Sequence, residues 1–115
     1  MTGREFPLHE YVEAVANSSG RAVATKGPAK YGDSWIVNSF STSTTSVAES
    51  ALRIYLGPEM QSAQKASTYS GNSDTAGGSE LVVQSQEKLT FVWSDADPGA
   101  RCVCTIYGRL ISQRV

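Results

Sequence analysis

The sequence predicts an all-β fold: an antiparallel β-sandwich, jelly-roll-like, of about seven strands with a short N-terminal helix or arm. After Gly20, apolar side chains alternate with polar ones over short segments, which is the two-residue period of a strand. Gly and Pro turn signals separate these segments. Ser and Thr make up 25 of the 115 residues, a composition that disfavours helices. The chain length allows one small domain with a single core.

Residues 1–20 follow a different period and are predicted to form a helical arm, with the sandwich over residues 21–115. Leu8, Tyr11, Val12 and Val15 recur at the spacing of one helix face. A helix of about three turns is marginal in water on its own, so it has to dock. The partner is either the chain's own domain or a neighbouring subunit, and we expect these four residues to form a subunit contact together with the 27–33 connection.

Seven segments after the arm have the pattern of strands. We expect strands at residues 21–25, 34–41, 51–56, 66–70, 80–84, 88–94 and 101–107. Residues 42–46 either continue the second strand or form a loop. Gly77-Gly78 is typical of a turn, and Gly108 is expected to interrupt the last strand as a bulge before residues 110–113.

The last two strands are predicted to pair as a hairpin across residues 94–101. Asp97-Pro98-Gly99-Ala100 provides the turn, because Pro presets φ at the second position and Gly accepts a positive φ at the third. Alternation then predicts which side chains of the sandwich meet in its core. They are Leu52, Ile54, Leu89, Phe91, Trp93, Cys104 and Ile106.

Two cysteines one residue apart, Cys102 and Cys104, would point to the same side of a strand. Parallel Cβ vectors are poorly placed for a disulfide. We therefore expect two reduced, buried thiols.

Residues that could perform catalysis are scarce. The segment from His9 to Glu13 superficially resembles a zinc-protease helix but lacks the second His, and the chain has only one histidine. No serine lies in a strand–elbow–helix context, and Gly77-Gly78 lacks the Lys-Ser/Thr of a phosphate loop. These absences predict a protein that is not an enzyme and has no cofactor.

Loop carboxylates raise two further alternatives, a Ca²⁺ site or a glycosidase pair. Asp95 and Asp97 share one loop, and Asp74 lies in another polar segment. Asp-Pro-Gly is also ordinary turn chemistry, which is the interpretation we favour over either site.

Six aromatic residues could form a sugar-stacking platform: Tyr31, Trp35, Tyr55, Tyr69, Trp93 and Tyr107. Trp93 alternates with Leu89 and Phe91 and so belongs to the core. Tyr55 and Tyr107 fall opposite the apolar positions of their strands. They are the candidates for surface recognition of a sugar or a neighbouring subunit.

Charge and hydropathy argue against two classes of partner, nucleic acids and membranes. The formal net charge is −1 and the basic residues are not clustered, which argues against nucleic acid and against an anionic membrane surface. No apolar run approaches the ~20 residues that span a bilayer, and the N-terminus lacks the pattern of a signal peptide.

The order of several motifs resembles small β-sandwich virion proteins of long-tailed bacteriophages of actinobacteria. The motifs are YGDSWIV (31–37), STSTTS (41–46), LRIYLG (52–57), TYSGNSDT (68–75), LTFVWS (89–94), DPGA (97–100) and IYG (106–108). The resemblance covers about residues 20–110; the cysteines and the N-terminal segment depart from it.

This resemblance implies a non-enzymatic structural protein of the virion, made in the host cytoplasm. It would be a capsid decoration or a minor tail component that contacts the major capsid or tail proteins. By analogy it would also be a homo-oligomer. The alternative is a carbohydrate-binding, host-adhesion sandwich displayed on the virion.

Overall fold

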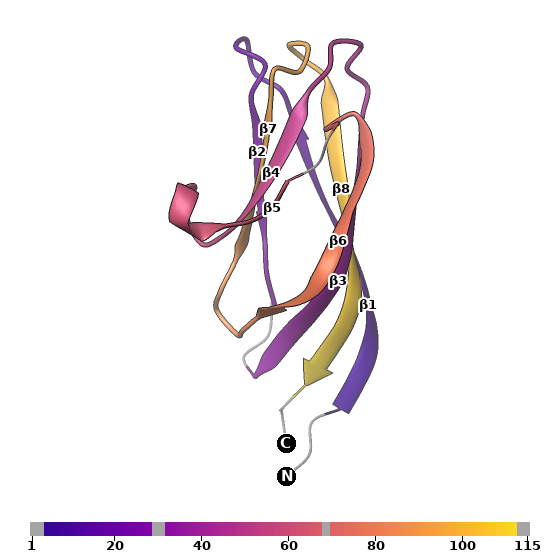
Figure 1. Cartoon of the computed structure of the whole chain (residues 1–115), viewed down its shortest axis with the longest axis vertical. Helices are drawn as coiled ribbons and strands as arrows, with labels where there is room; N and C mark the ends of the chain where they lie inside the picture. The colour runs from indigo at the N-terminus through magenta and orange to yellow at the C-terminus, as the bar shows by residue number, and fades with distance from the viewer. Residues whose placement is uncertain (1–3, 29–31, 68–69, 113–115) are drawn as a thin grey trace.

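The computed structural model describes residues 4–28, 32–67 and 70–112, and these fold into two antiparallel sheets packed face to face (Figure 1). The strands are β1 (Arg4–Val15), β2 (Ala22–Lys26), β3 (Asp33–Thr44), β4 (Ala51–Leu56), β5 (Gln64–Ser67), β6 (Ser73–Val83), β7 (Leu89–Ser94) and β8 (Arg101–Ser112). A single 3-10 turn, η1 (Gln61–Ala63), is the helical structure within these ranges. No helix in the described part of the chain is long and apolar enough to cross a membrane.

The strand order is that of a jelly roll. One sheet has the order β1-β8-β3-β6 and the other β2-β7-β4-β5. Most strands that follow one another along the chain therefore lie in opposite sheets, and most pairings join distant segments. The predicted all-β sandwich is confirmed, with eight strands where about seven were expected.

The predicted N-terminal helix is wrong, because residues 4–15 form strand β1. This strand pairs with β8 along its whole length, from Arg4 opposite Ser112 to Val15 opposite Arg101. The four residues that suggested a helix form two pairs four residues apart, and an even spacing also keeps residues on one face of a strand. Leu8 and Val12 point into the core, whereas Tyr11 and Val15 point outward.

The predicted pairing of β7 with β8 is also wrong. β7 lies between β2 and β4, whereas β8 lies between β1 and β3, so the intervening loop crosses from one sheet to the other. The turn within that loop is as expected: the Ala100 amide donates to the Asp97 carbonyl at 3.0 Å, and Gly99 has φ +84°. The loop is held instead by the β1–β2 connection, where the Ala16 amide donates to the Ala100 carbonyl at 2.9 Å.

The predicted core is confirmed, since all seven of its side chains are fully buried. They are joined by Trp35, Val37 and Phe40 of β3 and by Val83 of β6. One hydrogen bond connects the two sheets inside the core: the Trp93 indole N–H donates to Thr42 Oγ1 at 2.9 Å. The indole therefore buries its apolar body without leaving its polar group unpaired.

The expected interruption at Gly108 lies in the neighbouring strand. β8 is continuous, and the extra residue is Asn38 of β3, because Val37 pairs with Gly108 whereas Ser39 pairs with Tyr107. Gly108 is needed for close approach: a Cβ there would collide with the Ile36 carbonyl oxygen.

The remaining strand predictions hold with shifted ends. Residues 51–56 match β4, and residues 42–44 continue β3. The strand expected at 66–70 lies at 64–67, with residues 68–69 outside the described chain. The strand expected at 80–84 starts earlier, at Ser73, so Gly77 pairs within a strand and does not form a turn.

Candidate contact surface

The candidate contact surface is the outward side of the β1-β8-β3-β6 sheet. Cross-strand partners share a face, so the register places side chains in rows. Tyr11 lies opposite Thr105, which lies opposite Ser41, and His9 lies opposite Tyr107, which lies opposite Ser39. We call these six residues the aromatic face. It combines two tyrosines and an imidazole with three small hydroxyl-bearing side chains, Thr105, Ser41 and Ser39.

The aromatic side chains on this face are solvent-exposed in the isolated chain. Tyr11 is 62% exposed and Tyr107 is 41% exposed. The His9 ring stacks on the Tyr107 ring with centroids 5.1 Å apart and an interplanar angle of 21°. Stacking fixes both rings against the sheet, so little side-chain entropy remains to be lost when a partner covers them.

Charged residues border the aromatic face on two sides, where they neutralise one another. On one side Arg101 donates to Glu13 at 2.7 Å, and this hydrogen bond raises the pKa of the guanidinium. On the other side Arg109 lies 3.5 Å from Glu5 and 2.6 Å from Glu80. An aromatic centre with a polar rim is the arrangement typical of protein–protein interfaces.

Only half of the predicted contact residues reach this surface. Leu8 and Val12 are each 5% exposed and belong to the core, so the prediction that they dock on a neighbour is wrong. Tyr11 lies on the aromatic face and Val15 beside its Glu13–Arg101 border, and for these two residues a subunit contact stays a prediction. Of the 27–33 connection, residues 29–31 lie outside the described chain.

The two residues predicted to recognise a sugar or a neighbouring subunit lie in different environments. Tyr107 belongs to the aromatic face, but Tyr55 is only 7% exposed, so its placement on the open surface is wrong. The pairing of β4 with β5 shifts register between Ile54 and Tyr55, so simple alternation does not hold at this position. Trp35 and Trp93 are in the core, whereas Tyr31 and Tyr69 lie outside the described residues.

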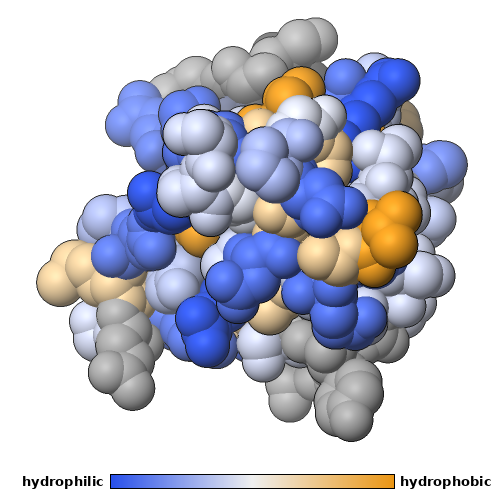
Figure 2. Space-filling view, turned by 90° about the horizontal axis from the view of Figure 1, so that it is seen from above, coloured by the Kyte–Doolittle hydropathy of each residue, from blue (hydrophilic) through white to orange (hydrophobic). Residues whose placement is uncertain are grey.

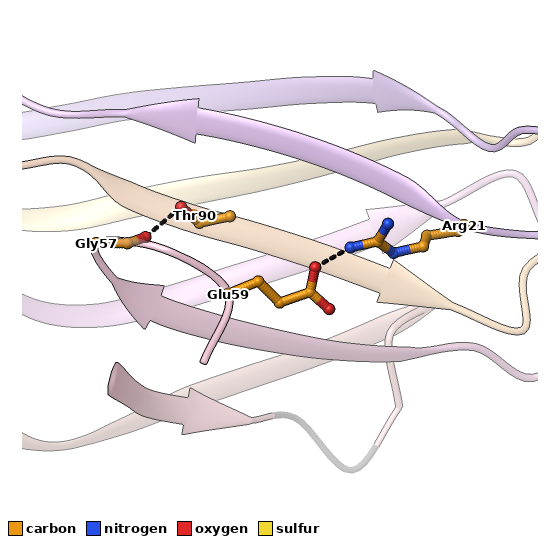
Figure 3. A network of polar contacts seen from close by, with 4 residues as sticks. All are labelled: Arg21, Gly57, Glu59 and Thr90. Atoms are coloured by element: carbon orange, nitrogen blue, oxygen red, sulfur yellow. Dashed lines mark hydrogen bonds and ion pairs between the residues drawn. The ribbon is translucent and has the colours of Figure 1, made fainter. Parts of the chain in front are cut away.

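A shallow pocket of about 390 Å³ lies on the other sheet, where Tyr55 forms part of the wall. Its remaining lining consists of Arg53, Glu59 and Gln64, so it is mainly polar. The adjacent chain segment is held at two points, shown in Figure 3. Arg21 pairs with Glu59, and the Thr90 hydroxyl donates to the Gly57 carbonyl at 2.5 Å.

The acidic loop residues have a structural role. The Asp97 carboxylate accepts hydrogen bonds from the Val47 amide at 2.8 Å and the Ala48 amide at 3.3 Å. These two bonds lower the pKa of Asp97, because they stabilise its charged form. Across residues 4–28, 32–67 and 70–112, no three His, Cys, Asp or Glu side chains gather in a way that could hold a metal ion.

The cysteines are the reduced, buried pair that was predicted. Cys102 and Cys104 are free and fully buried. Burial raises the pKa of Cys102 and raises the pKa of Cys104 to about 12. Both thiols therefore stay protonated at neutral pH and act as small apolar side chains.

No protein-family model matches the chain, and no curated protein matches it. Among solved structures, it is similar to a chain in the cryo-EM structure of the virus-like particle of extra small virus from the giant freshwater prawn Macrobrachium rosenbergii. That match has a TM-score of 0.49 and 13% sequence identity, and it covers 96% of this chain and 81% of that chain. The similarity assigns no role to any residue of this chain.

Proposed function

We propose that this protein is a non-enzymatic structural protein of a bacteriophage virion, an accessory building block of the capsid surface or of the tail. Its aromatic face is the main support, because an exposed aromatic surface with a paired-charge rim is suited to contact with another protein. The jelly-roll order of the strands is consistent with this role, since such sandwiches build viral capsid proteins as well as lectin domains.

The proposal assigns the contact energy to Tyr11 and Tyr107. Tyrosine is enriched among the residues that dominate interface energies, and truncation of such a residue typically costs more than about 1 kcal/mol. Both side chains project from the sheet outside the core, so changing them should leave the fold intact. The partners are the major capsid or tail proteins, or further copies of this chain.

The test is incorporation of variants into phage particles, with copies per particle measured by quantitative mass spectrometry. We expect the double variant Tyr11→Ser, Tyr107→Ser to fold normally and to be incorporated about tenfold less than the wild type or worse. Val23→Ser is the matched control, because Val23 is 46% exposed on the outward side of the other sheet. Normal incorporation of the double variant would refute the role of the aromatic face.

The copy number also distinguishes the two locations. A number comparable with that of the major capsid protein indicates a capsid decoration, whereas a handful of copies indicates the tail. Absence of the protein from purified particles would refute the virion role itself.

Carbohydrate binding is the second candidate function, and the polar pocket favours it. Arg53, Glu59 and Gln64 offer donors and acceptors suited to sugar hydroxyl groups, and Tyr55 forms part of the wall. The test is a glycan array on the purified protein, repeated with Arg53→Ala. Binding that Arg53→Ala abolishes supports this function, whereas an array without hits refutes it.

A further inference from the structure

One end of the molecule is mainly polar. This end appears uppermost in Figure 1, and seen from above in Figure 2 it is mostly hydrophilic with a few separate hydrophobic side chains. Scattered side chains of this kind are normal on a protein surface and indicate no binding site. The pocket on the β2-β7-β4-β5 sheet is better defined, because its lining combines charged groups, a hydrogen-bonding amide and an aromatic ring.

The outward side of that sheet is contacted by the chain itself. Thr90 and Val92 alternate with the core residues of β7 and so point outward, yet they are only 8% and 5% exposed. The segment after β4 folds back onto this side, where the Gly57 carbonyl accepts the Thr90 hydroxyl and Glu59 pairs with Arg21 across β7 (Figure 3). The pocket lies where this segment meets β4 and β5, whose residues complete its described wall.

The charges around the pocket do not balance. Glu59 is the acidic residue of the described lining, and it is already paired with Arg21. Arg53, the basic residue of that lining, forms no ion pair with another described residue. The three groups together leave one positive charge, on the Arg53 guanidinium, and this favours an anion as the ligand.

A carboxylate matches this charge better than a phosphate does. The guanidinium is planar, and its paired N–H donors fit the two oxygens of a carboxylate. One unbalanced guanidinium also offsets the single charge of a carboxylate, whereas a phosphate monoester carries about 1.5–2 negative charges at pH 7.

The rest of the lining is suited to a sugar ring. The Gln64 amide provides both donors and an acceptor, and the Glu59 carboxylate can accept from hydroxyl groups while Arg21 balances its charge. Tyr55 is 7% exposed, so its ring is a fixed wall that loses little entropy when a ligand binds. The volume of about 390 Å³ is near the lower end of the range for small-molecule sites, which agrees with a ligand as small as a single sugar.

We propose that this pocket binds an acidic sugar, a hexuronate, with the sugar carboxylate on the Arg53 guanidinium and the ring hydroxyl groups on Gln64 and Glu59. The proposal rests on the carbohydrate-binding candidate function and names the class of sugar which that function left open. It involves neither the aromatic face nor a virion role, because the pocket is on the other sheet.

The test is a titration of the isotope-labelled full chain followed by two-dimensional NMR. The ligands are glucuronate, galacturonate and mannuronate, each compared with its neutral hexose, which is glucose, galactose or mannose. We expect at least one hexuronate to bind with a dissociation constant on the order of 1 mM, and about tenfold or more tightly than its hexose, because only the hexuronate forms the charged hydrogen bonds. The amide signals that shift should include those of Arg53, Tyr55 and Gln64.

Arg53→Gln tests the carboxylate contact directly. Arg53 is exposed on β4, so the change should leave the fold intact, and the affinity for the hexuronate should fall about tenfold or more, to that of the hexose. Lys26→Gln is the matched control, since it removes one positive charge from the same sheet. Lys26 lies opposite the core residue Leu89 and so projects from the other side of the sheet, and this variant should bind like the wild type.

The outcomes separate this inference from the function on which it rests. Equal affinity for a hexuronate and its hexose would overturn the acidic sugar and leave carbohydrate binding standing, whereas binding of neither class would refute both at this pocket. Acetate that binds as tightly as the hexuronate would show that the ring is not recognised, and tighter binding of glucose 6-phosphate would show that the carboxylate is not preferred. Either result, or hexuronate binding that survives Arg53→Gln, would also overturn the proposal.

Discussion

At the scale of single residues, the most informative side chains are polar groups that hold loops in place. Asp97 is the clearest case, because its carboxylate accepts hydrogen bonds from two backbone amides of a loop about fifty residues earlier in the chain. Asn72 holds the other side of that loop, because its side-chain amide donates to the Ser46 and Ala48 carbonyls. Neither role is visible in the sequence, where Asp97 reads as part of a local Asp-Pro-Gly turn and Asn72 as part of a polar segment.

Asp97 should make stability depend on pH. Its folded-state pKa lies below the ordinary value of 3.8, so its contribution is present above pH 3.8 and is lost as the pH falls through the folded-state pKa. Asp97→Asn should therefore lower the melting temperature at pH 7, and the difference from the wild type should shrink in strong acid. Thermal scans from pH 7 down to pH 2 measure this difference.

Asp95→Asn is the matched control for that series. Asp95 is in the same loop at φ +63°, a conformation that Asn also tolerates, and we expect the wild-type melting temperature at pH 7. A difference between Asp97→Asn and the wild type that stays constant down to pH 2 would contradict the proposed role of the charge.

The two cysteines should be unreactive toward thiol reagents in the folded protein. A thiolate is needed for reaction with a disulfide reagent, and burial raises the pKa of Cys104 to about 12. We expect no reaction with Ellman's reagent at pH 8 under native conditions and reaction of both thiols in guanidinium chloride. Rapid labelling of the native protein would mean that β8 opens locally.

At the scale of elements, β1 shows where a periodicity argument reaches its limit. The spacing of four apolar residues fits one face of a helix: Leu8, Tyr11, Val12 and Val15. In a strand, the same spacing places Leu8 and Val12 on one face and Tyr11 and Val15 on the other. What decides between them is the twelve-residue pairing with β8, a strand about a hundred residues away, which no local pattern records. The same long-range pairing explains why the turn at Asp97–Ala100 was predicted correctly but the partners of its flanking strands were not.

Stability measurements on β1 separate the two alternatives. In a helix, Leu8 and Val15 would share one face and respond alike, whereas in the strand only Leu8 is buried. Leu8→Ala should lower the free energy of unfolding by about 2–5 kcal/mol. Val15→Thr, which keeps a β-branched side chain on an exposed position, should change it by less than about 0.5 kcal/mol. Urea denaturation measures both, and equal losses would contradict the strand.

At the scale of the whole molecule, alternation predicted the side chains that fill the core, although Thr90, Val92 and Tyr55 at the opposite positions of their strands are buried as well. Leu89, Phe91 and Trp93 are spaced two apart and are all fully buried. The aromatic face could not be predicted as a unit, because it needs the register of three strands that lie far apart in the sequence. Alternation along its strand predicted that Tyr107 lies on the surface. Its stacking on His9, however, follows only from the pairing of β1 with β8.

This topology should also determine how fast the protein folds. Of the strand pairs in the two described sheets, only β4 with β5 joins neighbours along the chain, so almost every pairing must close a long loop before it gains contacts. Sandwiches of this kind fold in milliseconds to seconds. We expect refolding at 25 °C in that range, followed by tryptophan fluorescence in a stopped-flow instrument.

The two tryptophans allow the sheets to be followed separately, because Trp35 is on β3 and Trp93 is on β7. If the sheets form only together, Trp35→Phe and Trp93→Phe variants should each show a single phase with a similar rate constant after correction for stability. Because most successive strands alternate between the sheets, pairing within one sheet brings the strands of the other close together, which favours joint formation. Two phases, one for each tryptophan, would mean that one sheet is stable before the jelly roll closes.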